Sequence, residues 1–347
     1  MITKETHSLG WITSLRNRLG TRTDPKLIEK VVYALCLLEQ LRIHEIQLIF
    51  KGGTSILLAT EKPTRFSIDI DIITEHTEDE IIVVLEKIVA TDLFIDWKPD
   101  NDRKHVIEAP IGHYKLYYIS VVDGKTEPIL LDVLYTANPY PATKKIPITH
   151  AWLNQEDEPI TVEVPTFDSI LGDKLTAFAP KTTGILYSKN RPVEIIKQLY
   201  DVAFLFDNME NIKTARNSFM EVVKEEIAFR KLNIEWHHVL DDIENTCYLL
   251  VERDQTSKQF LHLQTGIRNL TNFIIGRFNI EEAITAGAKV AYFSALLRNE
   301  NPTLPSRYNG PNEITDWVID QSSKPRLNKL KKSNPEAFFY WYKTYKL

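Results

Sequence analysis

Two short groups of residues, separated by thirteen positions, carry the side chains needed for phosphate chemistry. The first is a glycine pair followed by two hydroxyl residues, and the second is a pair of aspartates one residue apart. Glycine lets a backbone approach a ligand closely, and a helix that begins there offers N–H groups to a phosphate. Aspartates at positions i and i+2 of a strand point to one face, where they can share a hard cation such as Mg²⁺. The groups are Gly52, Gly53, Thr54 and Ser55, then Asp69 and Asp71.

The order of the surrounding elements makes this pair of groups more specific than either group alone. Glycine pairs are common, and an Asp-x-Asp on a strand is usually only solvated. Here residues 45–50 predict a strand, residues 52–59 a short helix, and residues 67–73 a strand with one wet face, because polar and apolar residues alternate there. The order strand, glycine turn, helix, aspartate strand favours a phosphoryl-type transfer assisted by metal ions.

The elements that must position these groups predict an α/β protein with two domains. Residues 25–43 and 78–90 have apolar residues at helical spacing, and two β-rich runs flank an Asp-Gly turn, which predicts a hairpin. A further strand precedes residue 165, and nearly all later segments have helical periodicity. The predicted domains are therefore residues 1–165 and 166–347. The hairpin runs are 114–122 and 129–135, the further strand is 161–164, and the helices are a segment from about 167, then 193–207, 211–230, 236–252, 257–276 and 280–299.

The composition excludes several classes of protein. The net charge of −5 argues against a protein that coats nucleic acid non-specifically. No run approaches the roughly 18 apolar residues that span a bilayer, and the first residues lack the apolar stretch of a secretion signal. Cys36 and Cys247 lie far apart within apolar helical patterns, which favours neither a disulfide framework nor a zinc site. The expected location is the cytoplasm, without a membrane partner.

The glycine and aspartate groups together resemble the pattern of the DNA polymerase β superfamily. More narrowly, residues 51–55 (KGGTS) and 65–71 (RFSIDID) are similar to the AbiEii/AbiGii toxin family, which includes the MenT toxins. Residues 173–178 (DKLTAF) resemble that family's helical lysine motif, and Arg191 followed by residues 197–202 (KQLYDV) resembles its next element. Together these motifs cover roughly residues 25–206, and Gln198 stands where the family usually has Asp.

The resemblance implies both a fold and an activity. The fold is a polymerase β-type nucleotidyltransferase domain with a mixed sheet, followed by a helical domain that completes the NTP cleft. The activity is that of a toxin, from a toxin–antitoxin or phage-defence system, which transfers a nucleoside monophosphate from an NTP to an acceptor hydroxyl. In relatives the acceptor is RNA, notably the tRNA 3′ end. The expected partners are therefore NTP, RNA and a cognate antitoxin, and the expected cofactor is Mg²⁺, or Mn²⁺ in its place.

Two other kinds of function remain open at this stage. The fold could keep an NTP as a sensor or assembly module without transferring anything. It could also act as a transferase on protein side chains.

The resemblance also implies roles for individual residues. Asp69 and Asp71 would bind metal, Lys174 would hold the NTP phosphates together with the glycine turn, and Asp201 would be a further catalytic acid. Lys174 could equally be a surface lysine, and a helix ion pair between Lys197 and Asp201 at i, i+4 would explain both of those residues.

Three further residues are candidates for the same site. Asp132 is an acid inside an apolar strand, so it needs a partner or a cation. The superfamily commonly places a third acid there, as a metal ligand or as a base, and the alternative is a salt-bridged residue at a strand edge. Ser67 lies on the predicted face of the two aspartates and could donate to a phosphate or a carboxylate, or be structural. Arg191 is a candidate nucleotide contact.

The C-terminal tail changes in charge and in aromatic content together. Residues 324–347 contain seven Lys or Arg against one acid, and residues 338–342 are five consecutive aromatics. In one interpretation the aromatics dock on the helical domain and the lysines are solvated. In the other, the basic residues contact an RNA backbone and an aromatic stacks on an unpaired base.

Overall fold

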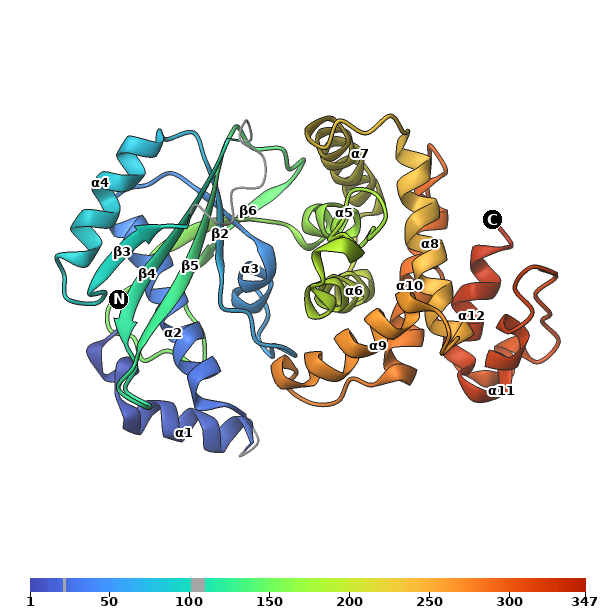
Figure 1. The fold of residues 1–347 in the computed structure, drawn as a ribbon, viewed down its shortest axis with the longest axis horizontal. Helices are drawn as coiled ribbons and strands as arrows, with labels where there is room; N and C mark the ends of the chain where they lie inside the picture. The colour runs from blue at the N-terminus through green and yellow to red at the C-terminus, as the bar shows by residue number, and fades with distance from the viewer. Residues whose placement is uncertain (21–22, 101–109) are drawn as a thin grey trace. The chain divides into compact units, whose positions relative to one another are not determined.

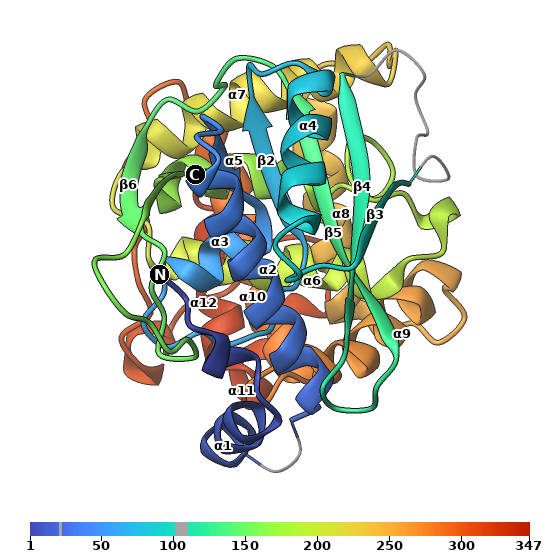
Figure 2. The same ribbon diagram turned by 90° about the vertical axis from the view of Figure 1, so that its left-hand side faces the viewer.

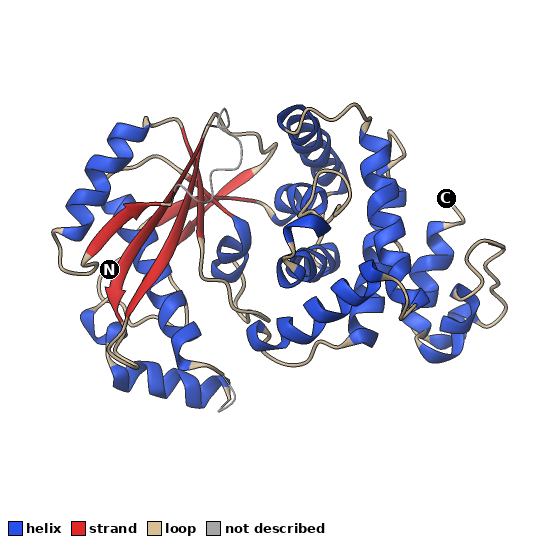
Figure 3. Cartoon of the chain, in the orientation of Figure 1, coloured by secondary structure: helices blue, strands red, loops and turns tan. Residues whose placement is uncertain are grey.

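The computed structural model describes residues 1–20, 23–100 and 110–347, which form two compact units. Unit 1 comprises Met1–Asn138, Thr143–Thr166 and Asn272–Gly276, and unit 2 comprises Pro139–Ala142, Phe167–Thr271 and Arg277–Leu347. All of the described strands belong to unit 1, and unit 2 is built from helices (Figures 1 and 3). The predicted fold class, an α/β half with a mixed sheet followed by a helical half, is confirmed.

Unit 1 is organised around a seven-stranded mixed sheet in the order β3-β4-β5-β2-β1-β7-β6. Strand β2 (Ile70–Thr74) runs parallel to β5 (Thr126–Tyr135), and β1 (Ile49–Lys51) runs parallel to β7 (Thr161–Pro165). The other neighbouring strands are antiparallel, including the predicted hairpin of β4 and β5. The remaining strands are β3 (Asp96–Pro99), β4 (Ile111–Ile119) and β6 (Thr143–Pro147).

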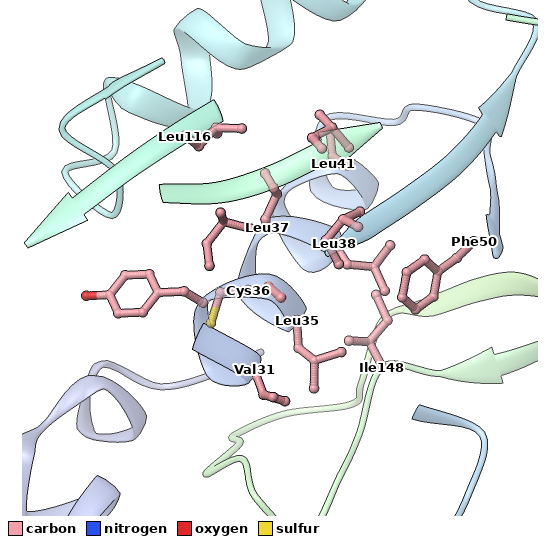
Figure 4. Packing of buried hydrophobic residues seen from close by; sticks show 14 of the residues in the cluster. Val31, Leu35, Cys36, Leu37, Leu38, Leu41, Phe50, Leu116 and Ile148 are labelled. Atoms are coloured by element: carbon pink, nitrogen blue, oxygen red, sulfur yellow. The ribbon is translucent and has the colours of Figure 1, made fainter. Parts of the chain in front are cut away.

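One face of this sheet carries the hydrophobic core of unit 1. Helices α2 (Pro25–Ile43) and α4 (Glu78–Val89) lie over it (Figure 2). Leucines of α2 pack with Phe50, Leu116 and Ile148 in the interior (Figure 4). Both helices were predicted, and both begin with strong local signals: Asp24 caps α2 before a proline, and a capping box opens α4. Two shorter helices complete the unit, α1 (Leu9–Leu19) and α3 (Gly52–Leu58).

Unit 2 is a helical assembly centred on α10 (Ile280–Leu297). Nearly every residue of α10 is buried, because α6, α8 and α12 all pack against it. Helix α5 packs against both α6 and α7. Over the described ranges, none of the helices is long and apolar enough to cross a membrane. The other helices are α5 (Phe167–Ala177), α6 (Pro192–Asp207), α7 (Ile212–Phe229), α8 (Trp236–Glu252), α9 (Lys258–Leu270), α11 (Leu330–Ser333) and α12 (Pro335–Thr344).

The aromatic run at the C-terminus forms most of helix α12. Residues 338–341 are fully or almost fully buried, and α12 packs along α10. Among the basic residues before it, Lys329 and Lys332 are exposed, whereas Lys331 Nζ donates to the carbonyl oxygens of Thr315 and Trp317. The aromatics therefore dock within the helical unit, and the four buried rings are not presented for base stacking.

Two predicted elements end earlier or begin later than expected. The strand predicted at residues 45–50 is β1, Ile49–Lys51, because Glu45 takes a left-handed backbone (φ 62°) in the turn that ends α2. The helix predicted at residues 257–276 ends as α9 at Leu270, because residues 272–276 return to unit 1. There Phe66 N donates to Phe273 O at 2.7 Å, and Ile275 N donates to Thr64 O at 2.8 Å.

Candidate active site

Four side chains form a row across neighbouring strands of unit 1. In the register of the sheet, Lys51 on β1 is opposite Asp71 on β2, Asp71 is opposite Asp132 on β5, and Asp132 is opposite His113 on β4. Residues that face each other in this way have their side chains on the same face of the sheet. We call Lys51, Asp71, Asp132 and His113 the carboxylate row.

The carboxylate row lies on the face opposite the hydrophobic core. Side chains alternate along a strand, and the neighbours of the two aspartates are buried in the core beneath α2 and α4. Asp71 and Asp132 themselves are only half-buried. The buried neighbours are Ile70, Ile72, Leu131 and Val133.

Asp69 lies one residue before β2, so the predicted strand at 67–73 begins later than expected. The alternation of the strand therefore does not by itself place Asp69 on the face of Asp71. Its backbone is instead fixed from the glycine turn, because Thr54 Oγ1 donates to Asp69 O at 2.6 Å. The side chain of Asp69 is half-buried, like that of Asp71.

The glycine turn is in direct contact with the aspartate strand. Gly52 has a φ of +80°, a conformation that favours glycine, and a β-carbon at this position would lie 2.0 Å from Asp71 Oδ2. A β-carbon at Gly53 would lie 2.4 Å from the Nη2 atom of Arg65 and 2.6 Å from Ser67 Oγ. Both glycines therefore leave room that the functional side chains of the neighbouring segment occupy.

The hydroxyl groups after the glycine pair are directed into the protein. Thr54 is fully buried, and its Oγ1 donates to Asp69 O and lies 3.0 Å from Ser67 Oγ. Ser55 is buried as well, and its Oγ donates to Gly52 O at 2.9 Å. These hydroxyls hold the turn against the aspartate strand, which leaves the backbone of the turn as the part that can approach a phosphate.

His113 is a site residue that the sequence analysis did not identify. Its Nδ1 lies 2.8 Å from Asp132 Oδ1, and the two side chains are 16% and 20% exposed. Asp132 therefore has the partner that an acid on an apolar strand requires. Only the cross-strand register brings the two residues together, and no spacing along the chain signals it.

In unit 2, three of the predicted motif residues meet between α5 and α6. Lys174 Nζ lies 3.1 Å from Asp201 Oδ2 and 3.2 Å from Gln198 Oε1. The side chains of Lys174 and Asp201 are only 12% and 4% exposed, so this is a buried ion pair. Gln198 completes it by accepting a hydrogen bond from the lysine.

The remaining motif residues of α6 lie differently. Lys197 Nζ contacts Glu194 at 3.0 Å, an i, i+3 ion pair on the same helix. Arg191 is exposed at the residue that precedes the first turn of α6. Arg191 is therefore at the start of the helix, two turns before the position at which Asp201 meets Lys174.

The chemistry of the donors suits a magnesium ion, although a preformed cage is not seen. Among residues 1–20, 23–100 and 110–347, no group of three or more His, Cys, Asp or Glu side chains is placed to hold a metal ion. Asp132, predicted as a third ligand, is bound to His113 instead. Asp69 and Asp71 supply hard carboxylate oxygens beside a glycine turn that a ligand can approach. Mg²⁺ is commonly bound by one or two carboxylates together with substrate phosphates.

A surface hollow of about 560 Å³ in unit 1 lies away from these residues. It is at the opposite end of β1 and β2, where Ile49 pairs with Ile73, whereas Asp71 pairs with Lys51. Its polar lining includes Arg42, His76 and Glu163. The carboxylate row is therefore not part of this hollow.

Comparison with known families assigns the protein a class and a family. Residues 36–276, more than half of the chain, match the family described as "Nucleotidyl transferase AbiEii toxin, Type IV TA system". By class the protein is a nucleotidyltransferase. It belongs to the AbiEii toxin family, as the motifs around Gly52, Asp69, Lys174 and Asp201 predict.

Two solved structures show a distant likeness to the chain. One is JHP933 from Helicobacter pylori, with a TM-score of 0.43 at 11% identity, covering 79% of this chain and 93% of that chain. The other is an H. pylori protein named provisionally as a nucleotidyltransferase, with a TM-score of 0.43 at 12% identity, covering 78% of this chain and 92% of that chain. No curated protein matches the sequence.

Proposed function

We propose that this protein is a metal-dependent toxin that transfers a nucleoside monophosphate from an NTP to a hydroxyl of RNA, with the tRNA 3′ end as the first candidate. The observation that carries the proposal is the contact between Gly52 and Asp71. It places a backbone that can approach phosphates against a carboxylate that can hold their metal ion. Membership of the AbiEii family supports nucleotidyl transfer as the reaction and an antitoxin as a partner.

The proposed reaction is an in-line displacement at the α-phosphate. A bond forms between the acceptor oxygen and the α-phosphorus, the bond to the β-phosphate oxygen breaks, and pyrophosphate leaves. The proton of the acceptor hydroxyl passes to a carboxylate, for which Asp132 is the candidate. A magnesium ion bound by Asp69 and Asp71 would stabilise the negative charge that develops on the phosphate oxygens.

Several residues of the chain bind or orient the nucleotide in this proposal. The backbone of residues 52–55 approaches the phosphates, while the hydroxyls of Thr54 and Ser55 keep the turn in place. Lys174 has three N–H donors, two of which contact Asp201 and Gln198, so a third can reach a phosphate oxygen. Asp201 then acts by holding that lysine. Ser67 and Arg191 are proposed as additional nucleotide contacts.

A labelling experiment tests the proposal directly. The purified protein is incubated with Mg²⁺, total bacterial RNA and each α-³²P-labelled NTP in turn, and the products are separated by size. Label in a tRNA-sized band, accompanied by pyrophosphate release, is the expected result. Asp71→Asn is the control, because it keeps the size of the side chain and removes its charge.

The same experiment separates the two alternatives. Label that stays with protein after nuclease treatment would indicate a transferase acting on protein side chains. Tight NTP binding without pyrophosphate release, under conditions that include RNA from several hosts, would indicate a sensor or assembly module.

Growth provides a second test, which concerns the toxin assignment. Expression of the intact protein without its antitoxin should arrest bacterial growth, and the Asp71→Asn variant should not arrest it at the same protein level. Equal arrest by both forms would show that toxicity does not depend on nucleotidyl transfer.

A further inference from the structure

We infer that His113 is a positioning residue, which holds the Asp132 carboxylate on the face of the sheet that carries Asp71 so that Asp132 can orient the acceptor hydroxyl. The inference rests on the proposed transfer reaction. It assigns a role to a histidine that has no place in the sequence motifs, and it separates the function of Asp132 from that of the metal-binding pair.

The first argument is geometric. His113 and Asp132 are register partners on the antiparallel strands β4 and β5, and Asp132 and Asp71 are register partners on the parallel strands β2 and β5. The three side chains therefore follow one another across the sheet on one face. The 2.8 Å contact between Nδ1 and Oδ1 fixes the rotation of the carboxylate about its terminal bond, which two strands alone would leave adjustable.

The second argument is electrostatic. Two carboxylates directly opposite each other on neighbouring strands repel, so without a partner Asp132 would turn away from Asp71. A histidine N–H on the far side of Asp132 counteracts this repulsion and keeps the carboxylate in the row. Both partners are more than three-quarters buried, so the hydrogen bond is protected from competition by water.

The third argument concerns which function Asp132 performs. The described residues contain no group of three His, Cys, Asp or Glu side chains placed for a metal ion, and one oxygen of Asp132 is engaged by His113. Asp69 and Asp71 remain as the pair for the metal. Asp132, next to that pair in the row, is suited to accept a hydrogen bond from the hydroxyl that attacks the phosphate.

The test uses the full-length protein and two substitutions of different kinds. His113→Leu removes the donor and keeps the bulk, whereas His113→Asn keeps an N–H close to the position of Nδ1. We expect His113→Leu to lower kcat by about 100-fold, as for a catalytic group misplaced by about 1 Å, and to change the KM for NTP by less than about threefold. His113→Asn should recover kcat to within about fivefold of the wild type, because the hydrogen bond is retained.

His76→Leu is the matched control. His76 also contacts a carboxylate, at 3.4 Å from Glu80, but it lies beyond the other end of β2 from Asp71. Its substitution removes a histidine–carboxylate contact of the same unit and should leave kcat within about twofold of the wild type.

Two measurements are independent of turnover. Nitrogen-15 NMR of the histidine rings should show His113 protonated at Nδ1 in the wild type, with a resonance that shifts in Asp132→Asn. Binding of Mn²⁺, measured by electron paramagnetic resonance without NTP, should be the same in His113→Leu and the wild type. These readouts report on the pair even if no acceptor RNA is labelled, so a failure of the proposed transfer reaction can be told apart from a failure of this inference.

Three results would overturn the inference. The first is wild-type kcat in His113→Leu, and the second is equal loss of kcat in the Leu and Asn variants. The third is a weakened affinity for Mn²⁺ in His113→Leu, which would make Asp132 a metal ligand rather than a residue that orients the acceptor.

Discussion

Gly52 and Asp71 are in contact across the turn between β1 and α3: a β-carbon on Gly52 would lie 2.0 Å from Asp71 Oδ2. The missing side chain of the glycine is thus the space in which the carboxylate lies. Because φ at Gly52 is also positive, the backbone and the carboxylate both depend on this one residue.

Replacing Gly52 with alanine should therefore abolish transfer. The β-carbon would displace the Asp71 carboxylate, and the left-handed backbone would cost about 1 kcal/mol in the free energy of unfolding. The control is Gly124→Ala, since Gly124 has a φ of +71° and a β-carbon added there would meet no atom within 4 Å. Both variants should lose similar stability in urea denaturation, and only Gly52→Ala should lose activity. Comparable activity in the two variants would show that Asp71 tolerates displacement.

Removing either aspartate of the pair should stop transfer while the protein stays folded. Asp69 and Asp71 are half-buried and lie on or next to the wet face of the sheet, so Asp69→Ala and Asp71→Ala should change the melting temperature little. Loss of metal-bound charge stabilisation should lower the rate by several kcal/mol, or at least about 1000-fold. Asp79→Ala, which removes an exposed carboxylate of α4, is the control. Label transfer within tenfold of the wild type in either variant would refute the assignment of the metal-binding pair.

The ion pair of Lys174 and Asp201 should contribute to stability as well as to activity. Both side chains are nearly buried, so Lys174→Ala leaves an unpaired carboxylate and should lower the free energy of unfolding by about 3 kcal/mol. The double variant Lys174→Ala/Asp201→Asn should be more stable than Lys174→Ala alone, because it removes the unpaired charge. Urea denaturation of the single and double variants measures the difference. A double variant no more stable than the single one would mean that the pair is solvated in solution.

Acid should destabilise unit 1 through two buried histidines. Burial lowers the pKa of His7 and of His150 to about 4, from an ordinary value of 6.5. Between these values the unfolded chain binds protons that the folded unit excludes, so the free energy of unfolding falls as the pH falls from 6.5 to about 4. His7→Phe/His150→Phe should reduce this slope in urea titrations between pH 7.5 and pH 5. An unchanged slope would assign the acid sensitivity to other groups.

The exposed basic residues before α12 should affect RNA binding and not folding. Arg326, Lys329 and Lys332 are exposed, and changing all three to Gln should leave the melting temperature unchanged. If RNA phosphates contact this segment, the affinity should fall and its dependence on salt should weaken by up to about three charges. Lys331 is kept, because it binds two backbone carbonyls. Lys213→Gln/Lys224→Gln on α7 is the control, and equal effects from both sets would indicate non-specific attraction only.

Local signals in the sequence were sufficient for most elements and for the motif residues. The helix predicted at residues 25–43 is α2, because a capping aspartate, a proline at the first position and an uninterrupted apolar stripe agree. The predicted hairpin of β4 and β5 forms around the Asp-Gly turn. The motif lysine and aspartate, distant in sequence, meet as the pair Lys174 and Asp201.

Features that depend on neighbours in space were not predictable in the same way. Strands β3 and β6 are at the two edges of the sheet, where one face or both are exposed and no apolar alternation is required. Their sequences, DWKP and TKKIP, therefore carry no strand signal. The partnership of His113 with Asp132 depends on the register of two strands, and the inward direction of the Thr54 hydroxyl depends on the position of Asp69 O.

The return of residues 272–276 to unit 1 has a consequence for biosynthesis. The segment that leads into the aspartate strand, from Thr64 to Phe66, pairs with Phe273 and Ile275, more than 200 positions later in the chain. On the ribosome these hydrogen bonds cannot form until most of the polypeptide has been made. The sheet, the glycine turn and both aspartates leave the ribosome first, and their last structural support arrives with the ninth helix already translated. A nascent fragment that stops short of this point lacks that support, so an enzyme harmful to its own cell would be completed only near the end of its synthesis.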